Sequence, residues 1–262
     1  LSLASVRTRK PNERKTAVKQ LITNAYENFE NIMRSDVFSD KDRVSFGEIN
    51  RKMDDITAAM AINTLCIYLE KYYGKKAIIM LDEYDTPMQE AWLSESWNEA
   101  VAFFRSFFNA TFKTNPNMHR GIITGITRIS KESIFSDLNH LEVVTTTSQK
   151  YADCFGFTEE EVFASLELMG LGKEKQGVKQ WYDGFTFGRH TDIYNPWSIT
   201  KFLSSNGEYN PYWADTSGNG LVNSLIQTGS DSIKQTMEIL INGGSFETQI
   251  DEQVIFNQLD ND

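Results

Sequence analysis

The sequence predicts an α/β fold, a parallel sheet with helices on both faces, and three observations carry this prediction. Two short apolar runs, 77–81 and 121–126, have the length of strands. Between them, the aromatic residues of 97–112 recur at helical spacing. The first run lacks any alternation with polar residues, so we expect a strand buried on both faces. Strands separated by helices of this length favour crossover connections, and therefore parallel pairing.

Weaker signals along the first half predict the flanking elements. Residues 1–6 have the character of a strand end, and a helix is expected over 15–34. A second helix, 56–73, carries apolar residues at helical spacing and should end at Gly74, because glycine commonly terminates helices. The segment 143–147 is a third strand candidate.

The second half of the chain is predicted to be mostly helical. Thr158 and Glu161 have the spacing of a capping box, and Asn195 with the proline after it is a typical helix start. We therefore expect two domains, a sheet core over 1–152 and a helical lid or appendage over 153–262.

The aromatic residues of this second part allow two interpretations. Trp181, Tyr182 and Trp197 are expected to fill the core of the helical part, because large aromatic side chains are usually well buried. The alternative is a surface on which nucleic-acid bases stack.

Charge and hydropathy exclude several classes of function. The net charge is −10, and residues 206–262 hold nine acidic residues against one basic residue. Such a segment repels phosphate backbones, so nucleic acid is expected as a partner only through a domain outside these residues. No apolar run approaches the ~20 residues of a transmembrane helix, so no membrane contact is expected. Cys66 and Cys154 are expected to be buried free thiols of a cytoplasmic protein.

The segment from Ile78 to Glu83 carries the strongest chemical signal. Asp82 and Glu83 are adjacent carboxylates directly after an apolar strand, at the sheet edge where α/β proteins bind ligands. Asp82 could hold a magnesium ion through its water shell, while Glu83, pointing to the other side, faces the attacking water. This is a Walker B pattern, and the alternative is a strand that ends in solvated acids. Asp85 is either a further polar ligand or, as we favour, a turn or cap residue.

The strand 121–126 is followed by a second group of candidates. Thr124 and Thr127 could contact the γ-phosphate or the water, and Arg128 could donate a fork of hydrogen bonds to phosphate oxygens. The alternative is that the threonines are ordinary β-branched strand residues and Arg128 a surface arginine. Spacing alone favours that alternative.

Five segments in consistent order resemble the predicted AAA-ATPase-like proteins, a family of bacterial P-loop ATPases. They are the Walker B segment 78–87, 124–128 with 133–136, 154–161, 181–185 and 194–198. The resemblance covers roughly residues 1–225. Tyr182-Asp183-Gly184 within one of these segments is weak by itself, but five ordered matches are specific.

The resemblance implies a P-loop ATPase core followed by a helical lid, for which a winged-helix-like form is one option. It implies ATP and magnesium as cofactors, with Asp82 on the metal, Glu83 as general base, and Thr124, Thr127 or Arg128 at the phosphate. Members of this family often carry a PD-(D/E)XK nuclease-like domain behind the ATPase.

Two features depart from the family pattern. The 262 residues contain no G-x-x-x-x-G-K-[ST] motif, which the family normally carries upstream of the part where Leu1 falls. Without the looped amides and the lysine of that motif, the triphosphate has no cradle, so these residues alone should bind ATP poorly. The only E-x-K triplet, Glu13 to Lys15, lies before Asp82 with no Pro-Asp pair ahead of it, so we reject nuclease chemistry here.

Two hypotheses from different classes follow. The first is an ATPase of the AAA or STAND type, which binds and hydrolyses ATP with magnesium when the phosphate-binding loop is supplied. The second is a degenerate, non-catalytic ATPase fold that serves as an interaction module, through a protein partner or self-association. A phosphate-binding loop encoded upstream of Leu1 would favour the first hypothesis, and its absence the second.

Overall fold

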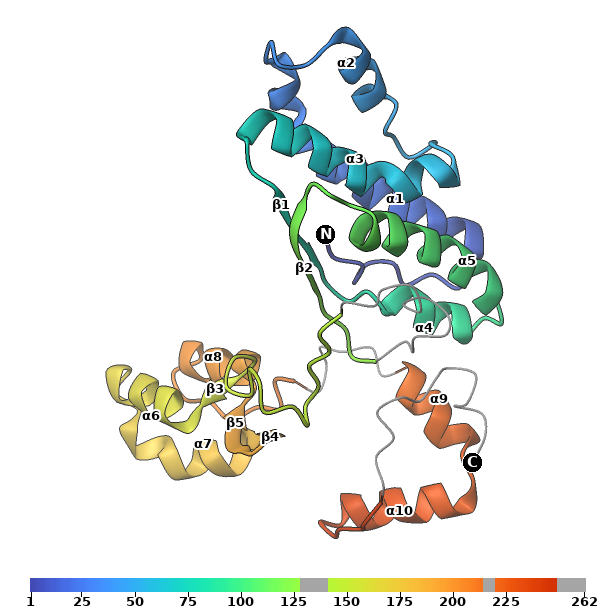
Figure 1. Cartoon of the computed structure of the whole chain (residues 1–262). Coiled ribbons are helices and arrows are strands. Elements are labelled where there is room, and N and C mark those ends of the chain that lie inside the picture. The colour runs from blue at the N-terminus through green and yellow to red at the C-terminus, as the bar shows by residue number, and fades with distance from the viewer. Residues whose placement is uncertain (128–140, 214–219, 249–262) are drawn as a thin grey trace. The chain divides into compact units, whose positions relative to one another are not determined.

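The computed structural model describes residues 1–127, 141–213 and 220–248, and the chain divides into two compact units (Figure 1). Unit 1 comprises residues 1–140 and 221–262, and unit 2 comprises residues 141–220. Each unit has a hydrophobic core of its own. None of the helices in the described ranges combines the length and the apolarity that crossing a membrane requires.

Unit 1 combines a small parallel sheet with helices. The elements before the sheet are α1 (Pro11–Glu27), η1 (Glu30–Arg34), α2 (Asp40–Gly47) and α3 (Asp55–Tyr73). The sheet region follows as β1 (Ala77–Leu81), α4 (Thr86–Trp92), α5 (Trp97–Phe108), the π-helical turn η2 (Asn109–Lys113) and β2 (Met118–Ile123). Late in the chain come α9 (Gly220–Thr228) and α10 (Asp231–Ile241). The helix expected over 15–34 is divided into α1 and η1, and the one expected over 56–73 is α3.

β1 and β2 pair in parallel, as the sequence predicts. Leu81 lies opposite Ile123, so the carboxyl ends of the two strands meet at one edge of the sheet. The start of the chain runs along the other side of β1, where the Leu3 amide donates to the Asp82 carbonyl oxygen at 2.9 Å. A parallel bridge also joins Ser2 to Asp82, so the chain begins in the strand-like form that was expected.

The burial of β1 differs from the prediction. Ile79 and Leu81 are buried, whereas Ile78 and Met80 are 59% and 64% exposed. The expectations of a strand buried on both faces and of helices on both faces are therefore wrong for the described part of unit 1. There α1, α3 and α5 lie to one side of the strands (Figure 1). An apolar run predicts a strand, but it does not show whether other elements cover one face of that strand or both.

Helix α5 contributes a cluster of aromatic side chains to the core of unit 1. Four phenylalanines of this helix are buried in one cluster with residues of α1 and α3: Phe103, Phe104, Phe107 and Phe108. Burying one such side chain stabilises the fold by ~1.5–3 kcal/mol. The helix that connects the two strands is therefore also the helix that holds them against the core.

The long helix α3 begins and ends as expected, and only some of its predicted apolar positions are buried. Asp54 caps its start by accepting a hydrogen bond from the Thr57 amide at 2.8 Å. Gly74 ends it with a φ of 67°, a left-handed conformation that favours glycine. Ile56 and Tyr73, which the helical spacing placed on the apolar face, are 79% and 56% exposed. Leu65 and Cys66, which were also placed on that face, are buried as expected, together with Ala58, Ala61 and Ile62.

Unit 2 has more helix than strand, in agreement with the mostly helical second part that the sequence predicts, and it adds a small antiparallel sheet that was not expected. Its elements are β3 (Phe157–Thr158), α6 (Glu159–Leu168), η4 (Gly172–Glu174), α7 (Lys175–Tyr182), β4 (Asp183–Phe187), β5 (His190–Tyr194) and α8 (Pro196–Ser204). The strands form an antiparallel sheet in the order β3-β5-β4. The candidate strand 143–147 is not a strand.

The helix starts predicted in unit 2 are confirmed. The Thr158 hydroxyl accepts from the Glu161 amide at 3.3 Å, and the Glu161 carboxylate accepts from the Thr158 amide at 2.9 Å. The Asn195 side chain accepts from the Ser198 amide at 3.0 Å at the start of α8. Each capping bond satisfies an amide that the first helical turn leaves without a partner.

The aromatic residues of unit 2 are only partly buried. Tyr182 is buried as expected, but Trp181 and Trp197 are 54% and 45% exposed, so their predicted burial is wrong. On α7 the buried residues are Val178 and Tyr182, one turn apart, and this spacing leaves Trp181 at the margin of the buried face. Trp181 belongs to α7 and Trp197 to α8, so their exposed side chains come from two different helices.

The two cysteines also differ in their surroundings. Cys66 is buried in the core of unit 1, and burial raises the pKa of its thiol. Cys154 is exposed, which contradicts the expectation that both thiols are buried. Neither forms a disulfide, as expected.

Candidate functional site

The carboxyl edge of the parallel sheet brings the first pair of candidate residues together. Asp82 follows β1 and Thr124 follows β2, and the Thr124 hydroxyl donates to Asp82 Oδ1 at 2.5 Å. The Ser2 hydroxyl donates to the other carboxylate oxygen at 3.3 Å. Three adjacent chain segments therefore meet at one exposed carboxylate.

Backbone pairing explains why Thr124 lies beside Asp82. The ladder between the strands continues past β2, since the Thr124 amide donates to the Leu81 carbonyl oxygen at 2.9 Å. The Thr124 carbonyl oxygen then accepts from the Tyr84 amide at 3.1 Å. Both backbone groups of Thr124 are thus fixed to the segment that carries Asp82, and its side chain is held at the strand end.

Glu83 occupies a turn rather than an extension of the strand. Its φ is 49°, a left-handed conformation that is uncommon for a residue with a side chain and is often found at functional sites. The strand alternation that predicted opposite directions for Asp82 and Glu83 therefore does not reach Glu83. The Glu83 carboxylate accepts from the Thr86 hydroxyl at 3.0 Å, and an Arg7 guanidinium nitrogen lies 3.7 Å away.

The surroundings of Asp82 fit a magnesium ion bound through water. A carboxylate offers about four lone-pair positions, and the hydroxyls of Thr124 and Ser2 occupy two of them. The exposed carboxylate keeps the others for water molecules. Mg²⁺ in nucleotide sites is typically held by one or two carboxylates and by substrate phosphates, not by a cage of protein ligands.

The remaining candidates lie elsewhere. The Thr127 hydroxyl donates to Asp85 Oδ2 at 2.6 Å, so its side chain faces this buried carboxylate and not the Asp82 edge. Asp85 lies at the start of α4, yet its side chain makes no capping bond there. Arg128, proposed at the phosphate, lies outside the described residues.

Three residues at this edge were not identified from the sequence. Ser2 and Arg7 come from the first segment of the chain, whose pairing with β1 has no short-range signature beyond its apolar start. Asp85 was interpreted as a turn or cap residue, because its partners lie about 40 residues later in the chain. A glycine directly after the second strand, Gly125, was the available hint that the backbone comes close to another segment there.

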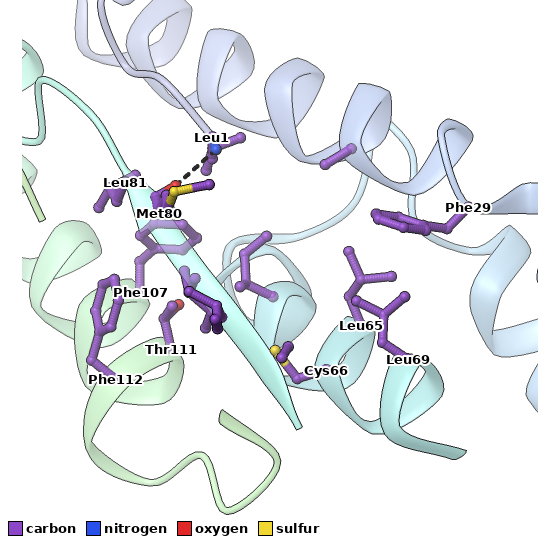
Figure 2. A pocket seen from close by; sticks show the side chains of 15 residues that line it. Leu1, Phe29, Leu65, Cys66, Leu69, Met80, Leu81, Phe107, Thr111 and Phe112 are labelled. Atoms are coloured by element: carbon purple, nitrogen blue, oxygen red, sulfur yellow. Dashed lines mark hydrogen bonds between the residues drawn. The ribbon is translucent and has the colours of Figure 1, made fainter. Parts of the chain in front are cut away.

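An apolar pocket of about 180 Å³ lies between β1, α3 and the end of α5 (Figure 2). Its lining side chains are apolar except for the Cys66 thiol and the Thr111 hydroxyl. At Leu1 the backbone nitrogen donates to the Met80 carbonyl oxygen at 2.9 Å (Figure 2). Such a lining offers no charged partner for a triphosphate, so the polar edge, and not this pocket, is the candidate site.

Comparisons with known proteins agree with the segments described above. Residues 1–135 match the profile of a family described as predicted AAA-ATPase. An uncharacterized protein in the vnfD 5′ region of Azotobacter chroococcum mcd 1 is 29% identical over 146 residues, which is 55% of this chain. The chain spans only 27% of that relative's length. No solved structure matches.

The family match includes the features that make up the polar edge. It spans the first segment with Ser2 and Arg7, the carboxylates of Asp82 and Glu83, and Thr124 at the end of the second strand. Because the match covers more than half of the 262 residues, the chain belongs to the AAA-ATPase-like family of predicted AAA-ATPases.

Proposed function

We propose that this chain carries the magnesium and water side of an ATPase site of the AAA or STAND type. The observation that carries this proposal is the exposed Asp82 carboxylate, held by the Thr124 hydroxyl at the carboxyl edge of two parallel strands. In α/β sheets this edge is where nucleotides bind. Family membership supports nucleotide binding on independent grounds.

In this proposal, Asp82 holds the divalent ion and Thr124 orients Asp82. Magnesium, when bound with ATP, supplies positive charge that bridges the phosphates and offsets the charge that develops during hydrolysis. A hydroxyl that fixes the rotamer of the carboxylate reduces the freedom that Asp82 loses when the ion binds.

Glu83 is the proposed general base. Its side chain is partly exposed, so a water molecule can reach it, and the Thr86 hydroxyl restrains its position. An Arg7 guanidinium nitrogen lies 3.7 Å from the same carboxylate. Arg128 is proposed to contact phosphate oxygens. Thr127, whose hydroxyl donates to Asp85, is proposed to hold the loop after β2 in place and not to contact the phosphate itself.

Hydrolysis also requires a phosphate-binding loop, which the 262 residues do not contain. We therefore propose that ATP turnover is a property of a protein in which another segment supplies this loop. In the same scheme unit 2 acts as the lid. The competing proposal, a non-catalytic interaction module, is favoured by the exposed apolar side chains of Ile78 and Met80.

The test uses two substitutions in the natural full-length protein. Glu83→Gln should keep ATP binding and lower turnover by ~10²–10⁴-fold, because the amide cannot accept a proton. Asp82→Asn should raise the magnesium concentration needed for ATP binding. Glu90→Gln is the control, since Glu90 is a nearby carboxylate whose nearest cation, Arg9, is 4.0 Å away. Full turnover by Glu83→Gln would refute the assignment of the base.

The interaction-module proposal makes the opposite prediction. If it is right, the full-length protein shows no magnesium-dependent ATP binding by calorimetry, and neither substitution changes its behaviour. The 262-residue chain alone should bind ATP poorly under the first proposal as well, because it lacks the amides and lysine of a phosphate-binding loop. Micromolar binding by this chain would show that the site has been assigned wrongly.

A further inference from the structure

Asp85 is a buried carboxylate whose contacts reach far along the chain. Only 1% of the residue is exposed. Its Oδ2 atom accepts hydrogen bonds from the Ile126 amide at 3.1 Å, the Thr127 amide at 2.7 Å and the Thr127 hydroxyl at 2.6 Å. The Gln89 side-chain amide donates to the same oxygen at 3.0 Å. Burying a charged group is costly unless it is well hydrogen-bonded, and three of these four donors belong to the loop after β2.

The second carboxylate oxygen of Asp85 explains the glycine in that loop. Oδ1 is buried and, in the described structure, has no hydrogen-bond partner. A Cβ atom added to Gly125 would lie 2.6 Å from this oxygen and 2.6 Å from the Tyr84 ring. Both distances are shorter than real Cβ contacts. The loop backbone therefore lies against Asp85 as closely as only a glycine permits.

Tyr84 holds the same loop from the adjacent position. Its hydroxyl donates to the Thr127 carbonyl oxygen at 2.6 Å, and its amide donates to the Thr124 carbonyl oxygen at 3.1 Å. Consecutive residues of the turn after β1 thus hold both ends of the 124–127 segment. Thr124, at the first end, is the residue whose hydroxyl contacts the Asp82 carboxylate.

Helix capping does not account for this arrangement. An aspartate at the N-cap position of a helix usually accepts a hydrogen bond from an amide of the first turn, and loss of that bond lowers the stability by about 1 kcal/mol. Asp85 lies at that position of α4, but its carboxylate makes no capping bond. Its hydrogen-bonding capacity is directed at the loop after β2 instead.

We propose that Asp85 is a positioning residue of the candidate ATPase site: it clamps the loop 125–127 and thereby fixes the Thr124 hydroxyl against Asp82. The inference rests on the proposed ATPase function for its catalytic consequence. Asp85 itself contacts neither ATP nor the attacking water. Its effect is expected in the catalytic rate and not in the affinity for ATP, because the loop orients groups around the metal and contributes no charge to the triphosphate.

The experiment compares Asp85→Asn, Asp85→Ala and Thr127→Val in the natural full-length protein. Hydrogen exchange of the Ile126 and Thr127 amides measures the clamp, and kcat and KM for ATP measure its consequence. Asp54→Ala is a matched control, because Asp54 accepts from the amide and the hydroxyl of Thr57, both at 2.8 Å, far from this loop in the sequence.

We expect Asp85→Ala to raise exchange of the two amides and to lower kcat by about 10- to 100-fold with little change in KM, as for residues that orient a metal ligand. Asp85→Asn should give a smaller effect of the same kind, because its amide oxygen can accept the same bonds without the charge. Adding Thr127→Val to Asp85→Ala should change little further, since both remove one interaction. Asp54→Ala should change neither the exchange of these amides nor kcat.

Three outcomes would overturn the inference. Unchanged exchange at Ile126 and Thr127 in Asp85→Asn and Thr127→Val would show that Asp85 does not clamp the loop. Increased exchange with an unchanged kcat would show that the clamp has no positioning role. A wild-type protein with no magnesium-dependent hydrolysis would refute the proposed function and the catalytic role together, while the exchange data would separately decide whether the clamp exists. If Asp85→Ala does not fold, the two milder variants still decide each point.

Discussion

Removing the Thr124 hydroxyl tests the proposed metal site most directly. Thr124→Val keeps the shape of the side chain and the backbone pairing, and it removes the hydrogen bond of 2.5 Å to Asp82 Oδ1. A hydrogen bond to a charged group contributes about 1.5–3 kcal/mol. Because Asp82 is exposed and water can replace the hydroxyl, we take the lower end of this range.

That value corresponds to about a tenfold loss of magnesium affinity, since 1.4 kcal/mol is a factor of ten. It agrees with the 10- to 100-fold loss, as an order of magnitude, found when partners of metal ligands are removed. The assay is ATP turnover of the natural full-length protein as a function of magnesium concentration. Thr124→Val should shift the half-saturating concentration upward about tenfold, and it should also lower the rate at saturating magnesium, because the Asp82 carboxylate is no longer held in one orientation.

A matched variant separates this effect from a general disturbance of the sheet edge. Ser2→Ala removes the hydroxyl on the other oxygen of Asp82, where the O–O distance is 3.3 Å. Since that bond is longer and weaker, its loss should shift the half-saturating magnesium concentration much less. An unchanged value in Thr124→Val, or equal shifts in the two variants, would refute the argument that Thr124 orients the metal ligand.

Two further predictions concern stability. Phe104→Ala should destabilise unit 1 by about 3–5 kcal/mol, because it leaves a cavity in the α5 cluster; calorimetric melting measures this, and Phe155→Ala, at a 66% exposed position, is the control that should change little. Burial raises the pKa of Asp183, as does the neighbouring Asp192 carboxylate, while Lys179 acts in the opposite direction. The ionised form therefore destabilises the folded state at neutral pH, and stability is regained as pH falls through the folded-state pKa. Asp183→Asn should raise the melting temperature at pH 7 and lose this advantage below that pKa, so equal gains at both pH values would contradict the assignment.

The sequence was informative wherever a local pattern decides the structure. The parallel pairing of β1 with β2 follows from two apolar runs separated by one long helix, and this pairing brings Asp82 beside Thr124. The Thr158 capping box and the Gly74 terminus are likewise decided within a few residues of the chain. The interactions that stabilise the capping box and the helix end join residues close together in the sequence, and those that stabilise the sheet join one pair of strands.

The hairpin of unit 2 could have been predicted but was not. Phe185 and Phe187 alternate with other residues, and Gly188 with one further residue separates them from β5. A two-residue connection with a glycine in the left-handed region, here φ 56°, is a strong hairpin signal. Phe185 and Phe187 lie in a segment rich in aromatic residues, and the segment as a whole was interpreted as helical core. The alternation of these two residues, which is typical of a strand, was therefore overlooked.

Other features had no local signal at all. The side chains of Ile78 and Met80 are as apolar as those of their buried neighbours in β1. Their exposure can therefore be seen only in the structure, where one face of the strand is left uncovered. The partners of Asp85 and the approach of Arg7 to Glu83 depend on contacts between segments dozens of residues apart. Such contacts follow from the topology and cannot be derived from spacing.

The three carboxylates of the turn after β1 differ most in their access to water, and this difference argues for three different roles. Asp82 is exposed, and the side chains that donate to its carboxylate in the described part of the chain are hydroxyls, which suits a group that must exchange water with a hydrated ion. Glu83 is partly exposed and held in a left-handed turn, which suits a base that must reach one water molecule. Asp85 is buried and bonded to backbone amides, which suits a fixed attachment point, because exchange with water would weaken the clamp.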